Sequence, residues 1–228
     1  MTREVTGIVL AGGRSSRFGS DKLSAPTSAR AGSRTVLDRA IEAVSAVARQ
    51  VIVVGREELD RQPGPGTVIR AVPDPEPFGG PLQALAGAFA AADSAPATAS
   101  GGESPHAALG IVVAGDMPSI VPAVLELLVH RLWEDQTVDA VVLADPREPA
   151  RRQPLPMAVR LGPARAAASA ALAAGDRSLV RLLARLSVAE LPAERWLPLD
   201  PAAASLVDID VPADLDRLHG GAIERRAR

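Results

Sequence analysis

A glycine-rich stretch near the amino terminus, residues 7–22, contains the residue types that bind phosphate. An apolar run breaks at two adjacent glycines, and three cationic side chains follow, namely Arg14, Arg17 and Lys22. Glycine lets backbone N–H groups approach an anion because no Cβ stands in the way, and cationic side chains bind phosphate oxygens. The stretch therefore predicts a phosphate-binding loop at the carboxyl end of a strand. Its composition also allows a plain glycine-rich turn with solvated arginines.

The loop matches neither of two common nucleotide-binding motifs. Gly19 is followed by Ser20, Asp21 and Lys22 instead of the Gly-Lys-Ser/Thr ending of a Walker A loop, and the G-x-G-x-x-G spacing is absent. The chain also lacks a Gly-x-Ser-x-Gly elbow and any cysteine, which argues against hydrolases that use those nucleophiles. The remaining chemistry must come from residues elsewhere in the chain.

Two aspartates follow apolar runs further along the chain. Asp74 comes after residues 68–72, and Asp116 comes after residues 107–114. If these strands are parallel, their carboxyl ends lie at one edge of a sheet together with the glycine-rich loop. A carboxylate repels a polyphosphate unless a cation lies between them, so Asp116 implies Mg²⁺. Its position is equally compatible with a cap on the helix that follows.

Apolar runs of strand length alternate with amphipathic stretches through most of the chain. This alternation predicts an α/β fold, a single-domain three-layer α/β/α sandwich with a mainly parallel, Rossmann-like sheet. The expected strands are residues 7–10, 51–54, 68–72, 107–114, 138–143 and 188–191. The expected helices contain residues 36–47, 81–89, 121–132, 164–174, 178–186 and 214–218.

Three other segments have a distinct composition. Residues 153–159 form a proline-rich extended segment, which we expect at an edge of the sheet because proline cannot donate to a ladder. Residues 93–106 are rich in Ser, Ala, Pro and Gly and predict a flexible surface loop. We expect one domain over residues 1–219, followed by a polar tail at 220–228 that frays.

The overall composition excludes several classes of function. The 228 residues carry a formal net charge of −2, so nothing indicates a nucleic-acid partner. The absence of cysteine excludes disulfides and thiolate metal sites, and the three histidines lie far apart in the sequence. Neither a signal peptide nor an apolar run of membrane-spanning length is evident. We therefore expect a soluble cytoplasmic protein that has no membrane partner.

A series of motifs, in the same order along nearly the whole chain, resembles those of the MobA-like nucleotidyltransferases, specifically the molybdenum cofactor guanylyltransferases. The motifs are Leu10-Ala11-Gly12-Gly13 with Asp21-Lys22, Gly80-Pro81-Leu82, Gly115-Asp116-Met117-Pro118, and residues 153–158, 175–179 and 208–215. The resemblance implies a fold like that of the nucleotide-diphospho-sugar transferases. It also favours a phosphate loop over a plain turn, and a metal ligand over a helix cap at Asp116.

The resemblance implies roles for individual residues. Lys22 matches the phosphate-binding lysine, Arg17 the basic residue of the same loop, and Asp116 the ligand of Mg²⁺; we take these three as catalytic. Asp210, ranked above Asp208, matches a position near the metal and the acceptor. With the chemistry of the loop, the expected nucleotide-binding residues are Leu10, Ala11, Gly12, Gly13, Arg14, Lys22, Asp74 and Asp116.

The implied reaction is Mg²⁺-dependent transfer of GMP from GTP to the phosphate of molybdopterin, with release of pyrophosphate. The implied partners are GTP and a molybdopterin-type small molecule, with transient contact to other proteins of molybdenum cofactor biosynthesis or to acceptor proteins. A phosphomonoester is largely anionic at neutral pH, so this reaction needs no residue to deprotonate the acceptor.

Alternatives to this function remain at the level of sequence. Asp21 before Lys22 favours GTP, because cytidylyltransferase relatives usually have proline there. The segment from Leu23 to Arg34 is longer than in the family, and Gly55-Arg56 stands where guanylyltransferases often have Asn, which leaves one base contact unassigned. A relative that uses CTP or another phosphorylated acceptor is the first alternative. A non-catalytic nucleotide-binding module is the second.

Overall fold

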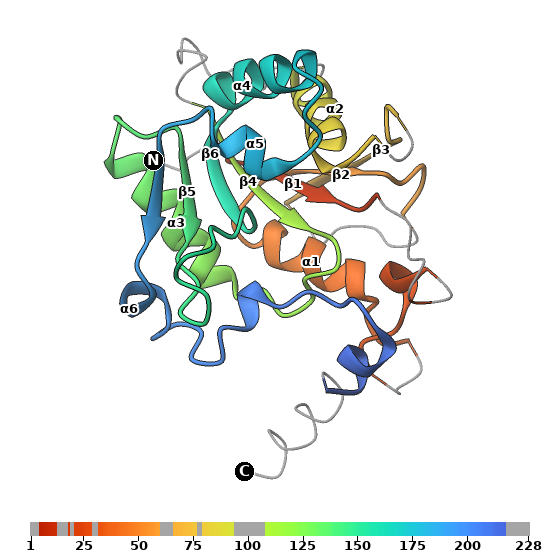
Figure 1. Cartoon of the computed structure of the whole chain (residues 1–228). Coiled ribbons are helices and arrows are strands. Elements are labelled where there is room, and N and C mark those ends of the chain that lie inside the picture. Colours follow the sequence, from red (N-terminus) through yellow and green to blue (C-terminus); the bar gives the residue numbers. More distant parts are fainter. Residues whose placement is uncertain are drawn as a thin grey trace.

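The computed structural model describes residues 5–12, 18, 21–28, 32–59, 66–76, 79–93 and 108–217. Seven strands of this part form one sheet in the order β3-β2-β1-β4-β6-β5-β7 (Figure 1). All neighbouring strands are parallel except at β6, which is antiparallel to both β4 and β5. The strands are β1 (Val5–Leu10), β2 (Gln50–Val54), β3 (Val68–Val72), β4 (Leu109–Ala114), β5 (Ala140–Leu143), β6 (Met157–Arg160) and β7 (Val188–Leu191).

Helices cover both faces of the sheet and create two apolar cores. One core packs α1 and α3 against the sheet, and the other packs α2, α4 and α5 against the opposite face (Figure 1). The sequence prediction of a three-layer α/β/α sandwich is thereby confirmed. The helices are α1 (Val36–Ser45), α2 (Pro81–Asp93), α3 (Pro122–Glu134), α4 (Leu161–Ala173), α5 (Leu179–Leu183) and α6 (Ala193–Trp196), with 3₁₀ turns η1 (Lys22–Ser24) and η2 (Ala204–Leu206).

Local sequence signals explain where several helices begin. Thr35 caps α1 in a reciprocal capping box with Asp38, which satisfies two backbone N–H groups that the first turn leaves without partners. Proline is the first residue of both α2 and α3, where its missing N–H costs nothing. Arg160 donates to the carbonyl oxygens of Leu132 and Asp135 at the carboxyl end of α3.

The expected edge position of residues 153–159 is wrong. The strand of this segment is β6, which is fully buried and pairs with β4 on one side and β5 on the other. The reason is that Pro154 and Pro156 precede the strand, so each of its four residues keeps the N–H group that a central ladder needs. The prolines lie before the strand and do not interrupt its hydrogen bonds.

Smaller differences concern short or peripheral elements. Val47 lies beyond the end of α1, α5 is shorter than expected, and α6 and η2 were not predicted because elements of three or four residues carry little periodicity. The predicted loop at 93–106, apart from residue 93, and the tail at 220–228 lie outside the described residues. Within the described part, none of the helices combines the length and the apolar character needed to cross a membrane.

Candidate active site

The loops that follow four parallel strands lie at one edge of the sheet. The N–H of Ala11 donates to Val54 O at 2.7 Å, the N–H of Gly55 to Val72 O at 2.8 Å, and the N–H of Gly115 to Leu10 O at 2.9 Å. Each bond extends the parallel ladder one residue past the ends of β1, β2 and β4. The loops after β1, β2, β3 and β4 therefore start side by side, as the sequence predicted for three of them.

The turn after β1 lies against the turns after β2 and β3. Gly55 has a φ of +94°, and a Cβ on it would stand 2.5 Å from the Cα of Gly12. A Cβ on Gly12 would stand 3.1 Å from Oδ2 of Asp74. Glycine is needed at Gly55, because its φ is positive and backbone atoms fill the place of a side chain, and the carboxylate of Asp74 faces the turn at Gly12.

Lys22 joins two carboxylates from distant parts of the chain. Its Nζ lies 2.7 Å from Oδ2 of Asp116 and 3.1 Å from Oδ1 of Asp210. The Lys22 and Asp116 side chains are 17% and 20% exposed, whereas Asp210 is 55% exposed. The ammonium group is thus half enclosed between the loop after β4 and the C-terminal segment.

Backbone contacts bring the C-terminal segment to this edge. The N–H of Ile209 donates to the carbonyl oxygen of Asp116 at 2.9 Å, and the Ile209 side chain is buried in the α1–α3 core. The carboxylate of Asp214 accepts from the N–H groups of Asp210 and Val211, both at 2.9 Å, at the start of the helical residues 212–217. In Figure 1 this blue segment passes beside the orange-red residues that include Lys22.

The clustered charges shift two pKa values in the site. Partial burial by itself lowers the pKa of Lys22, but hydrogen bonds and charges from Asp116 and Asp210 outweigh it and leave the pKa raised. Loss of hydration is the largest cause of a raised pKa at Asp208, and the negative charges of Asp210 and Asp116 add to it, although Asp208 as a whole is exposed. Lys22 is therefore positively charged in the site, and the carboxyl group of Asp208 holds its proton more strongly than a free aspartate does.

Asp116 has the donor atoms expected of a metal ligand. Its Oδ1 is buried and has no hydrogen-bond partner among the described residues, while its Oδ2 contacts Lys22. Mg²⁺ is usually held by one or two carboxylates together with phosphates and water. Over the described ranges no group of three or more acidic or histidine side chains is arranged to hold a metal, and the carboxylates of Asp116 and Asp210 share the ammonium group of Lys22.

The alternative of Asp116 as a helix cap is wrong. The next helix, α3, begins at Pro122, and its N-cap is Val121. The N–H of Val121 donates to Oγ of Ser205 at 3.0 Å, so this helix start is supported from the C-terminal segment. The carboxylate of Asp116 lies instead at the sheet edge with Lys22.

An ion pair between Arg56 and Asp21 was not expected from the sequence. Nη1 of Arg56 lies 2.6 Å from Oδ2 of Asp21, and Nη2 donates to Oδ1 at 3.0 Å. The fork holds the residue next to Lys22, and it comes from the loop after β2. The only sequence signal was the departure from the family pattern at Gly55-Arg56, to which no function was assigned.

Among the residues predicted for the site, the structure places Leu10, Ala11, Gly12, Lys22, Asp74, Asp116 and Asp210 at this edge of the sheet. Gly13, Arg14 and Arg17 lie outside the described residues.

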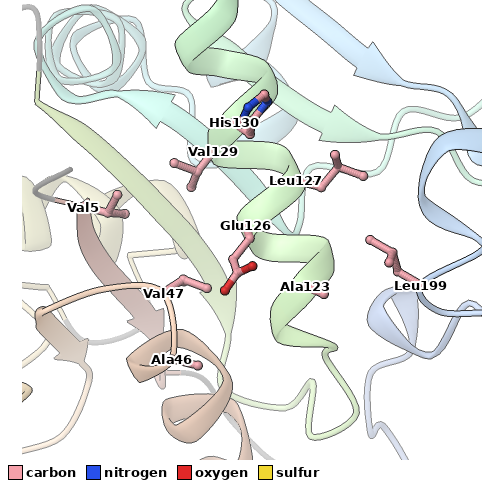
Figure 2. Close-up of a pocket in the computed structure, with 9 residues that line it drawn as sticks. All are labelled: Val5, Ala46, Val47, Ala123, Glu126, Leu127, Val129, His130 and Leu199. Carbon is pink, nitrogen blue, oxygen red and sulfur yellow. The ribbon is translucent and has the colours of Figure 1, made fainter. Parts of the chain in front are cut away.

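A cavity of about 720 Å³ lies elsewhere in the molecule (Figure 2). It is lined by aliphatic side chains from the end of α1 and from α3, with Glu126 and His130 as polar members and Leu199 on the far side. None of the predicted site residues lines it. The described residues of its lining include no lysine or arginine, the cations that bind a triphosphate, so the sheet edge is the better candidate for the active site.

The sequence was compared with known families and proteins. The sequence model of a family described as the MobA-like NTP transferase domain matches residues 7–191. A curated relative from Chloroflexus aggregans, named a probable molybdenum cofactor guanylyltransferase, is 33% identical over 211 residues, which cover 92% of this chain and 91% of the relative.

Solved structures share the fold at lower identity. Molybdopterin-guanine dinucleotide biosynthesis protein A from Archaeoglobus fulgidus superposes with a TM-score of 0.69 at 21% identity, covering 96% of this chain and 99% of that one. A 4-diphosphocytidyl-2C-methyl-D-erythritol synthase from Anaerococcus prevotii gives a TM-score of 0.64 at 15% identity, covering 97% and 96%. These likenesses establish the nucleotide-diphospho-sugar transferase-like fold predicted from the sequence.

Proposed function

The chain belongs to the MobA-like NTP transferase family, and from this premise we propose that it transfers GMP from GTP to the phosphate of molybdopterin. An oxygen of the acceptor phosphate attacks the α-phosphorus of GTP and forms the new P–O bond. The bond from the α-phosphorus to the bridging oxygen of the β-phosphate breaks, and pyrophosphate leaves with that electron pair. The protein is a nucleotidyltransferase; the choice of GTP and molybdopterin is the proposed part.

The observation that carries the proposal is Lys22 between Asp116 and Asp210, next to the turn at Gly12. A cation and carboxylates beside a glycine turn at the carboxyl ends of parallel strands suit the binding of a metal–triphosphate complex. Lys22 would contact phosphate oxygens, and the backbone of Ala11 and Gly12 would lie along the phosphates. Asp74 would take the nucleoside side, because it faces Gly12 from the loop after β3.

The proposed reaction needs the negative charges of its two reactants neutralised and the reacting groups aligned. It needs no general base. The second pKa of a phosphomonoester is about 6, so the acceptor is already anionic at neutral pH. We therefore assign Asp116 and Asp210 to hold Mg²⁺. Arg14 and Arg17, from the glycine-rich stretch that ends at Lys22, would supply further positive charge. When bound, the metal would neutralise the triphosphate and polarise its oxygens. Lys22 holds the phosphates in line with the acceptor and carries positive charge at every pH near neutrality.

Two observations bear on the choice of nucleotide and acceptor. The curated relative's name supports GTP and the molybdenum cofactor, and Asp21 before Lys22 agrees with the guanylyl branch of the family. Structural neighbours that are cytidylyltransferases share only the fold, and they make CTP the competing substrate. Handover of the product to other proteins of cofactor biosynthesis in the cytoplasm belongs to the same proposal.

The test is a substrate panel. The purified protein with Mg²⁺ is incubated with molybdopterin and, separately, GTP, CTP, ATP or UTP, and released pyrophosphate is measured along with the mass of the product. We expect pyrophosphate and a molybdopterin–guanine dinucleotide with GTP only. Release with CTP in place of GTP would overturn the guanylyl assignment, and no release with any nucleotide would contradict the transfer reaction itself.

A matched pair of variants controls this panel. Lys22→Met removes the charge between Asp116 and Asp210, whereas Arg131→Ala removes a cation that pairs with Asp135 at the end of α3. Pyrophosphate release that survives in Arg131→Ala and disappears in Lys22→Met excludes a contaminating activity. Equal release from both variants would mean that the sheet edge is not the active site.

A further inference from the structure

The dipeptide Gly55-Arg56 contacts both ends of the segment that leaves β1 and returns at Lys22. Gly55 packs against the backbone of Gly12, and Arg56 forms its two-point ion pair with Asp21. Both contacts come from the single turn after β2. This turn therefore sets the separation between the glycine turn at the start of the segment and the lysine at its end.

Asp21 connects Arg56 to Lys22, because it pairs with Arg56 and directly precedes Lys22 in the chain. Its Oδ1 accepts from the N–H of Leu23 at 3.1 Å, and its Oδ2 accepts from Oγ of Ser24 at 2.9 Å, so it is the N-cap of η1. The buried side chain of Leu23 anchors the same turn in the α1–α3 core. Because Lys22 lies between the cap and this anchor, fixing the carboxylate of Asp21 also fixes the direction in which the lysine leaves the backbone.

Arg56 also controls charge beside the proposed triphosphate site. A free carboxylate at Asp21, next to the residue that would bind phosphate, would repel the nucleotide. The hydrogen bonds from Arg56 are the largest cause of the lowered pKa of Asp21, so this carboxylate stays ionised and paired. A row of alternating charges results, from Arg56 through Asp21 and Lys22 to Asp116.

We propose that Arg56 is a positioning residue for nucleotide transfer, which acts through Asp21 to direct Lys22 toward the sheet edge and to neutralise the carboxylate beside the triphosphate. The inference rests on the proposed function and deepens it. It assigns a role to the position where the family pattern is broken. Both terminal nitrogens of Arg56 contact the carboxylate of Asp21, which favours a role through Asp21 over a direct base contact.

The experiment is a double-mutant cycle on nucleotide binding and turnover, with one conservative variant beside it. Mg²⁺–GTP affinity is measured by calorimetry, and kcat and KM by pyrophosphate release, for Arg56→Ala, Arg56→Lys, Asp21→Asn and the double variant Arg56→Ala/Asp21→Asn. We expect Arg56→Ala to weaken GTP binding about tenfold, mainly through KM, and Arg56→Lys to restore part of the loss, because lysine keeps the charge without the two-point contact. In the Asp21→Asn background the same change to Ala should cost less than about twofold, because the carboxylate that it acts through is gone.

Arg131→Ala is the matched control, since it breaks an arginine–aspartate pair at a 2.9 Å distance that is remote from the sheet edge. Thermal unfolding of every variant separates loss of function from loss of fold. If Arg56→Ala unfolds, Arg56→Gln takes its place, because it keeps most of the side chain's bulk without the charge.

The outcomes separate this inference from the proposed function. Wild-type protein that releases no pyrophosphate with any nucleotide overturns both. Normal wild-type turnover with an Arg56→Ala loss that is equally large in the Asp21→Asn background overturns the positioning role, and indicates that Arg56 contacts the nucleotide itself. An Arg56→Ala protein that behaves like Arg131→Ala also overturns it.

Discussion

Lys22 has two sets of partners in the proposed reaction, and they compete. In the structure its ammonium group lies between Asp116 and Asp210, where it neutralises carboxylates that would otherwise repel each other. A triphosphate needs the same charge. We therefore expect the lysine to move from the carboxylates to the phosphates when a metal–nucleotide complex binds, with the metal taking over the carboxylates.

The first prediction at this scale concerns Asp116→Asn. The amide keeps the size of the side chain but removes the negative charge, so turnover should fall about 10²–10³-fold, the usual cost of losing one electrostatic contact to a transition state. The fold should remain, because Oδ1 has no hydrogen-bond partner among the described residues. Steady-state pyrophosphate release and circular dichroism check both points. Activity within a factor of two of wild type would refute the role of Asp116.

The second prediction concerns the pH dependence of Asp208. Its pKa is raised in the fold, so the unfolded chain releases the proton first as the pH rises above 3.8. Its favourable contribution to stability is therefore complete below that pH and is lost as the pH rises through the higher folded pKa. We expect Asp208→Asn to be more stable than wild type at pH 7.5 without metal, and this advantage should shrink at pH 4.5. Urea unfolding at both pH values in the presence of EDTA measures the difference, and an advantage that grows toward acid pH would contradict the assignment.

At the scale of elements, the turn after β2 at the sheet edge is more tightly packed than the turn that precedes β3. Gly55 combines a φ of +94° with backbone atoms of Gly12 only 2.5 Å from where a Cβ would be. Gly66 has a similar φ of +97°, but among the described residues no heavy atom lies within 4 Å of that point. Replacing Gly66 with alanine therefore tests the cost of the backbone conformation by itself. Replacing Gly55 adds the cost of a clash with neighbouring backbone.

This contrast gives a third prediction. Gly66→Ala should destabilise the protein by about 1–2 kcal/mol, the usual cost of a left-handed conformation for alanine. Gly55→Ala should cost at least about 3 kcal/mol, because backbone must also move, and it should abolish nucleotide binding by displacing Gly12. Urea denaturation and calorimetry with GTP check the pair. Equal stability losses with intact binding would show that the turn at Gly12 can shift freely.

At the scale of the whole molecule, the edge that holds the proposed active site is bordered by a segment that lies outside the sheet. The chain leaves β7 and passes through α6, and a buried Trp196 donates to the carbonyl of Ala144. It then returns to Asp116 through Ile209. The matched family region ends at residue 191, so Asp208 and Asp210 lie beyond it, in this returning segment.

The fourth prediction tests whether this C-terminal segment supports the site. Ile209→Ala removes a side chain that is 1% exposed and should destabilise the protein by about 2–5 kcal/mol. Ile41→Ala in α1 makes the same change in the same core and should cost a comparable amount. Only Ile209→Ala should lower turnover at a temperature where both variants are folded, because it loosens the backbone that carries Asp210. Equal turnover would mean that this segment does not support the reaction.

The sequence alone determined the architecture and most of the sheet edge. Apolar runs alternating with amphipathic stretches specify parallel strands covered by helices, and polar residues directly after the strands must then meet at one edge. Gly12, Asp74 and Asp116 were predictable for this reason. The signal is local, since strand length, helical period and the residue after a strand are all visible within a few positions of each other.

The tertiary structure decided which side chains pair across that edge. Lys22 and Asp210 are 188 residues apart, Arg56 and Asp21 are 35 apart, and no local pattern encodes either contact. The same holds for β6, whose central place depends on partners from β4 and β5. Local periodicity reports only which face of an element is buried. Which charge neutralises which, and which strand lies in the middle, follow from how the whole chain packs.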